Sequence, residues 1–245
     1  MGIWSKLKKH RILARHQSIR PFLPETHLLN QQTLFYLLRK YPVLYLKPDR
    51  GTGGGGIIRI RRGRKAYHVQ AGVTSRIVQD RRKLYSVVTR LTGRRRYLVQ
   101  QGISMVTIKR RPIDYRLLVL KPGTSWEVMG IMGKWAAPNK IVTNYCRGGR
   151  PIRLFNSLRR SMGMSEQQCR KTEQRIFALG LQVARAMNPY SLRELGLDLA
   201  IDRNLRIYLL EVNTGPQFKL FRFHADRTLH RKIAGYVRRI RSRRR

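Results

Sequence analysis

Apolar residues recur at three- and four-residue spacing in four stretches of the chain, which is the pattern of a helix with one buried face. The first stretch stops at Pro42, because proline cannot continue a helix. In the third, Ser165 and Gln168 form a capping box, the signature of a helix start. These patterns predict helices over residues 28–41, 73–91, 165–188 and 229–240.

Short apolar or alternating runs between these stretches are typical of β-strands. The last two runs are joined by a short polar turn at Arg203-Asn204 and suit a hairpin. The predicted strands are VLYLKP (43–48), IIRIRR (57–62), YLVQQGI (97–103), DYRLLVLK (114–121), SWEVMGIMGKWA (125–136), LGLDLAID (195–202) and RIYLLEVN (206–213).

Helices and strands mixed in this order predict an α+β fold of two lobes, since 245 residues suffice for one large domain or two small ones. Turn signals at Pro21 and Pro24 separate a basic N-terminal segment from the rest. We expect a basic leader or loosely docked arm over 1–20, a first lobe over 21–103, a second lobe over 104–237 and a basic tail over 238–245.

Charge changes this picture most. The chain has 53 Lys and Arg against 12 Asp and Glu, a net charge of +41, and such self-repulsion favours polyanionic partners. Hydrophobic residues make up 42% of the chain, which excludes a disordered polyelectrolyte. No uncharged apolar run of about 18 residues occurs, which excludes a membrane-spanning helix. The start, MGIWSKLKKHR, lacks the apolar stretch of a signal peptide, so we expect the cytoplasm.

The two cysteines, Cys146 and Cys169, make neither a disulfide framework nor a zinc-binding spacing. The six histidines are dispersed, and no Ser/His/Asp pattern occurs. A covalent protein nucleophile is therefore not expected.

The run Gly53, Gly54, Gly55 and Gly56 lies between two predicted strands. A dinucleotide-binding loop would be followed by a helix, and a P-loop would end in Gly-Lys-Ser/Thr, so neither motif fits. A glycine flap between strands can instead bring backbone N–H groups to a phosphate chain, with Lys47 adding a point charge. The alternative is a flexible surface turn.

Carboxylates are scarce, and four of the twelve lie within 18 residues: Glu194, Asp198, Asp202 and Glu211. Glu211 and Asn213 share a strand face. A turn at Arg203-Asn204 places Leu209 opposite Asp198, which makes Glu211 its diagonal neighbour at about 7–8 Å. Two carboxylates and an amide oxygen suit Mg²⁺. Alternatively, these acids pair with surface arginines.

Asp114 and Arg116 share a face of another strand. A buried arginine needs an anion, which is either Asp114 as a structural partner or a transferring phosphoryl group. Asn144, in the loop TNYCRGG, has the chemistry to contact a phosphate, although a lone loop asparagine is more often a turn former.

Taken in order, a set of segments resembles the YheC/YheD-like branch of the ATP-grasp enzymes, from about Leu23 to Phe218. The segments are LPET, YLKPDRGTGGGG, YLVQQGI, DYRLLVL, IVTNYCRGG, ELGLDLAID and YLLEVNTGP. The resemblance implies that ATP lies between a lid lobe with the glycine flap and a larger lobe with the metal carboxylates.

The resemblance also implies a role for individual residues. Lys134 is expected to be catalytic together with Arg116 and Asn144, although it stands where related proteins often carry arginine. No acidic residue follows Gln101 to bind the ribose. The N-terminal domain of many ATP-grasp enzymes is expected to be missing or vestigial. The implied roles are phosphate binding for Lys47 and Gly53 to Gly56, adenine binding for Gln100, Gln101 and Ile103, γ-phosphate contact for Arg116 and Asn144, and Mg²⁺ binding for Asp198, Glu211 and Asn213.

These residues favour an ATP- and Mg²⁺-dependent ligase that joins a carboxylate to an amine or thiol through an acyl phosphate. The protein then needs to supply only alignment and charge stabilisation. The resemblance further suggests association with the spore coat. The alternative is a non-catalytic protein of this fold that binds polyanions or nucleic acid through its basic surface and tails.

Overall fold

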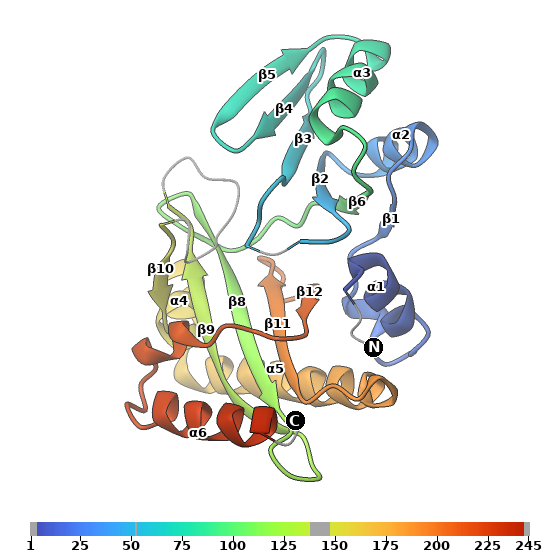
Figure 1. The fold of residues 1–245 in the computed structure, drawn as a ribbon. Coiled ribbons are helices and arrows are strands. Elements are labelled where there is room, and N and C mark those ends of the chain that lie inside the picture. The colour runs from blue at the N-terminus through green and yellow to red at the C-terminus, as the bar shows by residue number, and fades with distance from the viewer. Residues whose placement is uncertain (1–3, 52, 138–147, 243–245) are drawn as a thin grey trace.

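A computed structural model describes residues 4–51, 53–137 and 148–242 and divides them between two antiparallel sheets (Figure 1). Within these ranges no helix combines the length and the apolar character that crossing a membrane requires. The helices are α1 (Lys6–Ala14), α2 (Gln31–Lys40), α3 (Arg81–Thr92), α4 (Leu154–Met162), α5 (Glu166–Ala186) and α6 (Leu229–Ser242), with 3-10 turns η1 (Arg20–Phe22), η3 (Asn188–Tyr190) and η4 (Lys219–Phe223). The strands are β1 (Thr26–Leu28), β2 (Val43–Pro48), β3 (Ile58–Arg62), β4 (Tyr67–Ala71), β5 (Thr74–Val78), β6 (Tyr97–Gln101), β7 (Thr107–Ile108), β8 (Arg111–Leu120), β9 (Glu127–Trp135), β10 (Arg150–Ile152), β11 (Glu194–Ile201) and β12 (Ile207–Asn213).

The small lobe is a six-stranded sheet in the order β1-β6-β2-β3-β4-β5. Apolar residues of α2 and α3 pack on one face of it, with Leu37 and Leu84 fully buried against Leu46 and Ile60 of the strands. The opposite face carries Tyr45 and Lys47 toward the large lobe. One face of this sheet therefore makes the lobe's core, and the other is available for a site.

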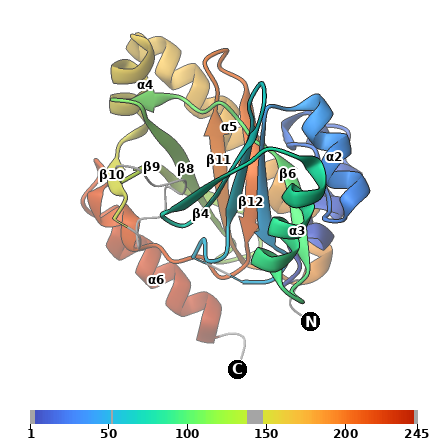
Figure 2. The same cartoon turned by 90° about the horizontal axis from the view of Figure 1, so that it is seen from above.

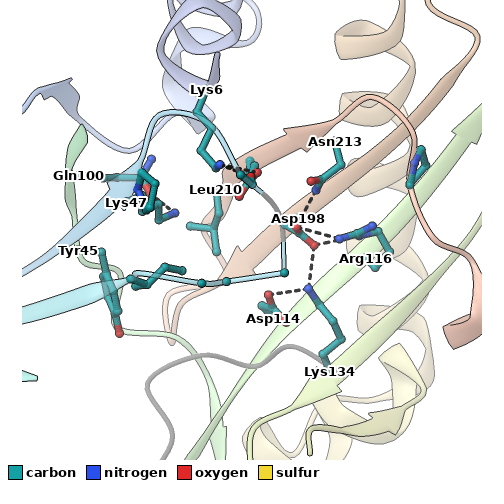
Figure 3. A pocket seen from close by; sticks show the side chains of 18 of the residues that line it. Lys6, Tyr45, Lys47, Gln100, Asp114, Arg116, Lys134, Asp198, Leu210 and Asn213 are labelled. Atoms are coloured by element: carbon teal, nitrogen blue, oxygen red, sulfur yellow. Dashed lines mark hydrogen bonds and ion pairs between the residues drawn. The ribbon is translucent and has the colours of Figure 1, made fainter. Parts of the chain in front are cut away.

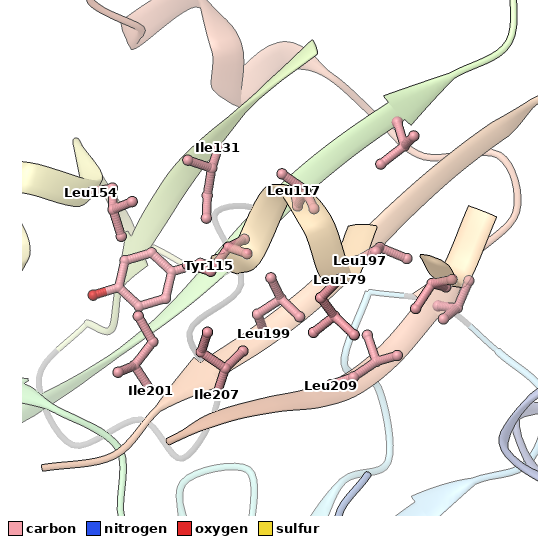
Figure 4. Close-up of a cluster of buried hydrophobic side chains, with 14 of the residues drawn as sticks. Tyr115, Leu117, Ile131, Leu154, Leu179, Leu197, Leu199, Ile201, Ile207 and Leu209 are labelled. Atoms are coloured by element: carbon pink, nitrogen blue, oxygen red, sulfur yellow. The ribbon is translucent and has the colours of Figure 1, made fainter. Parts of the chain in front are cut away.

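The large lobe is built on the strand order β10-β9-β8-β11-β12. The helices α4 and α5 cover one face and α6 the other, as the view from above shows (Figure 2). Leu179 of α5 packs among Leu117, Leu197 and Leu199 of the strands (Figure 4). Together the two lobes confirm the predicted α+β fold class.

The N-terminal segment is not the loosely docked arm that its charge predicts. Ser5 caps α1 by accepting a hydrogen bond from the backbone N–H of Lys8, and Leu7 and Leu13 are buried. The buried ammonium of Lys9 donates to the carbonyl oxygen of Val212 on β12. Apolar residues between the basic ones therefore make α1 part of the large lobe's packing.

Truncating Leu13 tests whether α1 is part of the fold. Its side chain is 2% exposed in the large-lobe core, so Leu13→Ala is expected to lower the free energy of unfolding by about 2–5 kcal/mol. Urea denaturation measures the change, with the exposed Lys8→Ala as control. Equal midpoints for the two variants would show that α1 is detached in solution.

The predicted helix over 73–91 is wrong over residues 73–80. Thr74–Val78 forms β5, which pairs with β4, a strand that the sequence analysis missed. Gly72 makes the tight turn between them with φ +61°. The helix α3 begins only at Arg81, where the Asp80 carboxylate accepts from the N–H of Lys83. Ile77 shares the helical spacing of Leu84 by coincidence.

The predicted register of the last hairpin is also wrong, by two residues at Asp198 and by one at Leu199. Asp198 pairs directly with Glu211, and Leu199 pairs with Leu209, because a β-bulge separates the two pairs. The extra residue is Leu210, which lines the cavity between the lobes. In a regular strand, residues two apart share a face, so Leu209 and Glu211 would point the same way. The bulge instead keeps Leu209 in the core and turns Glu211 toward the same face as Asp198.

The basic tail expected from Arg238 onward is partly structural. The helix α6 continues to Ser242, Ile240 is buried, and Arg241 donates two hydrogen bonds to the Glu194 carboxylate. Removing residues 238–245 would therefore also remove core contacts. Residues 243–245 lie outside the described part of the chain.

Candidate functional site

A cavity of about 640 Å³ lies between the two lobes (Figure 3). Residues of both sheets, the glycine flap and α1 line it. Gly56 is not among the lining residues, and Asn144 lies outside the described residues. The cavity brings together the predicted residues Lys47, Gly53, Gly54, Gly55, Gln100, Gln101, Ile103, Arg116, Lys134, Asp198, Glu211 and Asn213.

Apolar side chains line one part of the cavity. Tyr45 comes from β2 and Leu210 from the bulge of β12, while Ile103 and Met105 belong to the segment that joins the lobes. Such a lining buries the faces of a planar ring better than it buries charged groups. The cavity therefore has room for an aromatic ligand group beside its charged part.

Lys47 is positioned by Gln100. The Lys47 ammonium donates to the Gln100 side-chain oxygen at 2.6 Å, and the Gln100 side-chain nitrogen donates to Thr26 Oγ1 at 2.9 Å. Burial lowers the pKa of Lys47, while the negative charges of Glu211 and Asp198 oppose that shift. The side chain of Gln100, which was expected to bind adenine, is thus engaged with Lys47 and Thr26. An anion bound in the cavity would offset the desolvation cost of the buried Lys47 charge.

A second lysine reaches the cavity from α1. The Lys6 ammonium donates to the Gly51 carbonyl at 2.7 Å and lies 3.6 Å from Glu211 Oε1. Sequence reasoning missed Lys6 because it is one basic residue among many, separated from Gly51 by 45 positions. A detectable signal was present, since Ser5 before the apolar Leu7 and Leu13 is a helix start.

Both ends of the flap are held in place. At its start, the Asp49 carboxylate accepts from Ser5 Oγ at 2.8 Å and from the Leu7 N–H at 3.0 Å. At its end, the Tyr97 hydroxyl donates to the Gly56 carbonyl at 2.9 Å. A Cβ on Gly56 would lie 2.8 Å from that hydroxyl, so glycine is required there. Gly56 anchors the flap, and Gly53 to Gly55 face the cavity.

Four charged side chains form a cluster on the large sheet. Arg116 donates to Asp198 Oδ1 at 2.9 Å and to Oδ2 at 3.0 Å. Lys134 lies 2.8 Å from Asp198 Oδ1 and 2.9 Å from Asp114 Oδ2. Burial raises the pKa of Asp198, but Arg116 and Lys134 outweigh it and hold that pKa well below its usual range. The Asp198 carboxylate is thus the centre of this charge cluster.

The residues expected to bind magnesium fit unequally. Both Asp198 oxygens already accept from protein donors, including Asn213 Nδ2 at 2.9 Å. That amide also donates to the Gly196 carbonyl, so its orientation is fixed and its oxygen is left for another ligand. Glu211 is 22% exposed, and its nearest cation is Lys6. Glu211 and Asn213 therefore offer the hard oxygen ligands that Mg²⁺ prefers.

Among the described residues, no group of three or more His, Cys, Asp or Glu is arranged to hold a metal. A metal at this place would need the Asn213 amide and a ligand's own oxygens. The cavity lining has five cationic residues, Lys6, Lys47, Arg116, Lys134 and Lys219, against three acidic ones. The arrangement suits a polyphosphate.

Two proteins of Bacillus subtilis (strain 168) are similar to this chain in sequence. Endospore coat-associated protein YheD is 23% identical over 250 residues, which cover 96% of this chain and 54% of that protein. Endospore coat-associated protein YheC is 24% identical over 212 residues, which cover 83% and 57%. The chain therefore spans about half the length of these curated relatives.

Two solved structures share the fold at 13% sequence identity. The D-cycloserine synthetase DcsG matches with a TM-score of 0.59, over 96% of this chain and 70% of that one. The ATP-grasp ligase PsnB, in complex with precursor peptide PsnA2 and AMPPNP, matches with a TM-score of 0.52, over 97% and 59%. The fold of this chain is thus the ATP-grasp fold.

The family model described as YheC/D like ATP-grasp matches residues 1–239. This range contains both sheets, α1 and every residue that lines the cavity. The chain therefore belongs to the YheC/D-like ATP-grasp family.

Proposed function

We propose that the protein is an ATP- and Mg²⁺-dependent ligase that joins a carboxylate to an amine or thiol through an acyl phosphate. The observation that supports this most is the convergence of Lys6, Lys47 and the glycine flap on one cavity wall, facing Glu211 and Asn213. ATP has the matching chemistry, an aromatic base and a chain of phosphates. The ATP-grasp ligases that share the fold support the reaction class.

In this proposal the adenine occupies the apolar part of the cavity, beside Tyr45 and Leu210. The ammonium groups of Lys6 and Lys47 and the backbone N–H groups of the flap hold the phosphates. Gln101 contributes little through its side chain, because that oxygen accepts from the Glu25 N–H at 3.2 Å. Glu211 and Asn213 would hold Mg²⁺, which would neutralise part of the negative charge of the phosphates.

Two steps then complete the proposed reaction. A carboxylate oxygen of the substrate attacks the γ-phosphorus, the bond to the β–γ bridging oxygen breaks, and ADP leaves. An amine or thiol attacks the acyl carbon, the bond to the phosphate oxygen breaks, and phosphate leaves while the nucleophile's proton passes to solvent. Among the described residues, Arg116 Nη1 has no hydrogen-bond acceptor, so we assign to it the stabilisation of the transferring phosphoryl group. Lys134 acts by positioning Asp198.

Calorimetry tests the binding part of this proposal. ATP with Mg²⁺ is expected to bind more tightly than inorganic triphosphate or GTP, because only ATP matches both the phosphate contacts and the base site. Equal affinity for all three would show charge-driven adsorption and overturn the proposal. Mass spectrometry of products from ATP with a panel of carboxylates and amines then identifies the substrates.

Substituting Lys47 tests the phosphate contact. Lys47→Ala removes a charge-assisted hydrogen bond worth about 1.5–3 kcal/mol, so ATP affinity is expected to fall by about 10- to 150-fold. Calorimetry measures the change. The matched control is Lys83→Ala on the same lobe, whose side chain is 81% exposed and lies outside the cavity. Equal losses in the two variants would mean that only net charge matters.

The net charge of +41 supports a second candidate, a polyanion-binding protein without turnover. Polyanion affinity should fall steeply with salt, whereas ATP held in the cavity should show a shallower dependence. Sequence-selective nucleic-acid binding that persists at high salt, with no turnover for any acceptor, would favour this candidate. Cytoplasmic location and association with a spore coat stay predictions for this chain.

A further inference from the structure

The small lobe ends in an exposed edge strand, β5. It pairs with β4 on one side, and four of its five residues are exposed. Ile77 is 67% exposed and Val73, in the preceding turn, is 74% exposed. An edge strand with free backbone groups and apolar side chains is a template for a further strand. The part of the chain that the structure describes provides no strand to cover it.

The hairpin register shows which backbone groups are available. The two-residue turn makes Ala71 and Thr74 the closing hydrogen-bonded pair, so hydrogen-bonded pairs recur at every second residue. Ser75 and Ile77 are therefore the residues whose N–H and C=O point away from β4. Their side chains share one face, and Arg76 lies on the other.

Charge selects the kind of partner. Residues 50–96 contain fourteen Lys and Arg and one acidic residue, Asp80, whose carboxylate caps α3. A second copy of this chain would bring the same positive charge to the edge and be repelled. An acidic polypeptide would be attracted. If its residues alternate, the apolar ones lie beside Ile77 and the acidic ones beside Arg76.

We propose that β5 is a docking strand for an extended acidic segment of a partner polypeptide, which adds to the sheet beside it. Tyr45, Arg59, Gln70 and Ser75 form one cross-strand row from the cavity wall to this edge. Three strand spacings separate Tyr45 from Ser75, about 14 Å. A docked segment therefore lies within a few residues' reach of the cavity, yet its binding does not depend on ligase activity.

The test uses a fluorescein-labelled peptide of alternating Glu and Val, twelve residues long by design, at about 150 mM salt. Fluorescence anisotropy should show saturable binding. The same peptide N-methylated at alternate residues cannot complete the strand ladder, and its affinity should fall at least about 10-fold. A peptide of equal composition with all Glu before all Val should also bind more weakly, and so should a single-stranded oligonucleotide of equal charge.

Protein variants locate the site. Ser75→Pro removes an outward N–H without touching the ladder to β4, so it should weaken peptide binding, whereas Ser75→Ala should not. Ile77→Ser should weaken it as well. Glu211→Gln should leave peptide binding unchanged, which separates this proposal from the ligase proposal. Equal binding of the N-methylated and unmodified peptides to the wild-type protein, or of the oligonucleotide and the peptide, would overturn the docking strand without any variant.

Discussion

Replacing Asp198 by asparagine is expected to lower the free energy of unfolding by about 3–5 kcal/mol, because it leaves Arg116 and Lys134 buried without their shared anion. Asp198 Oδ1 accepts from both cations, at 2.9 and 2.8 Å, so one substitution removes the carboxylate that Arg116 and Lys134 share and leaves Lys134 with Asp114. Urea denaturation near neutral pH measures the change. The control is Glu166→Gln, which breaks only the exposed pair with Arg170 on α5 and should cost about 0.5 kcal/mol or less.

The same variant should change how stability depends on pH. The folded protein holds the pKa of Asp198 below the ordinary value of 3.8, so the Asp198 contribution is fully present above that value. It is lost as the pH falls from there toward the lowered pKa. Glu25, with a folded pKa of about 2, titrates in the same range and is unchanged in the variant. Asp198→Asn should therefore lose stability less steeply than the wild type below about pH 4, and parallel curves would contradict the buried charge cluster.

Sequence alone predicts much of the large lobe. The capping box predicts the start of α5, and Ser165 and Gln168 form its two reciprocal hydrogen bonds in the structure. The strands β8, β11 and β12 are mostly apolar apart from their site residues, because both faces of the large sheet are covered. In such long and strongly patterned elements, the local sequence determines the secondary structure, and tertiary packing does not change it.

The errors arise where local pattern and tertiary packing differ. Charge conceals α1, whose apolar Leu7 and Leu13 stand between lysines and arginines. Ile77 of β5 happens to lie at helical spacing from Leu84, so the pattern predicts a helix where the structure has a strand. The bulge at Leu210 has no sequence signal, since it appears only when two strands are paired.

The site shows the same division. Glu211 and Asn213 are predicted to share a face because they lie two apart on one strand, and both line the cavity. Lys6 depends on a contact between α1 and the flap, which no local pattern encodes. The Asp198 carboxylate was expected to be open for a metal, whereas Arg116, Lys134 and Asn213 occupy its oxygens. The groups that contact the Asp198 carboxylate come from neighbouring strands, and the sequence does not specify which side chains pair across strands.

Replacing Glu211 by glutamine should abolish most of the magnesium dependence of ATP binding. The substitution keeps the shape of the side chain but removes the negative charge that attracts Mg²⁺, while Lys47 and the flap remain to hold the phosphates. Magnesium-free ATP affinity should not fall. Turnover, once an acceptor is known, should fall at least about 100-fold, since the lost charge stabilisation matters most in the transition state.

Calorimetric ATP titrations with and without Mg²⁺ give the readout for Glu211→Gln, and they need no acceptor. Glu173→Gln is the matched control, because Glu173 lies on α5, outside the cavity. The loss of Glu211 also removes the anion that faces Lys6, 3.6 Å away. That ammonium then keeps the Gly51 carbonyl but no longer faces a carboxylate, so it is freer to bind phosphate, and magnesium-free affinity should rise rather than fall. If Glu211→Gln keeps the full magnesium effect, the metal is held elsewhere, and Glu211 serves only as the partner of Lys6.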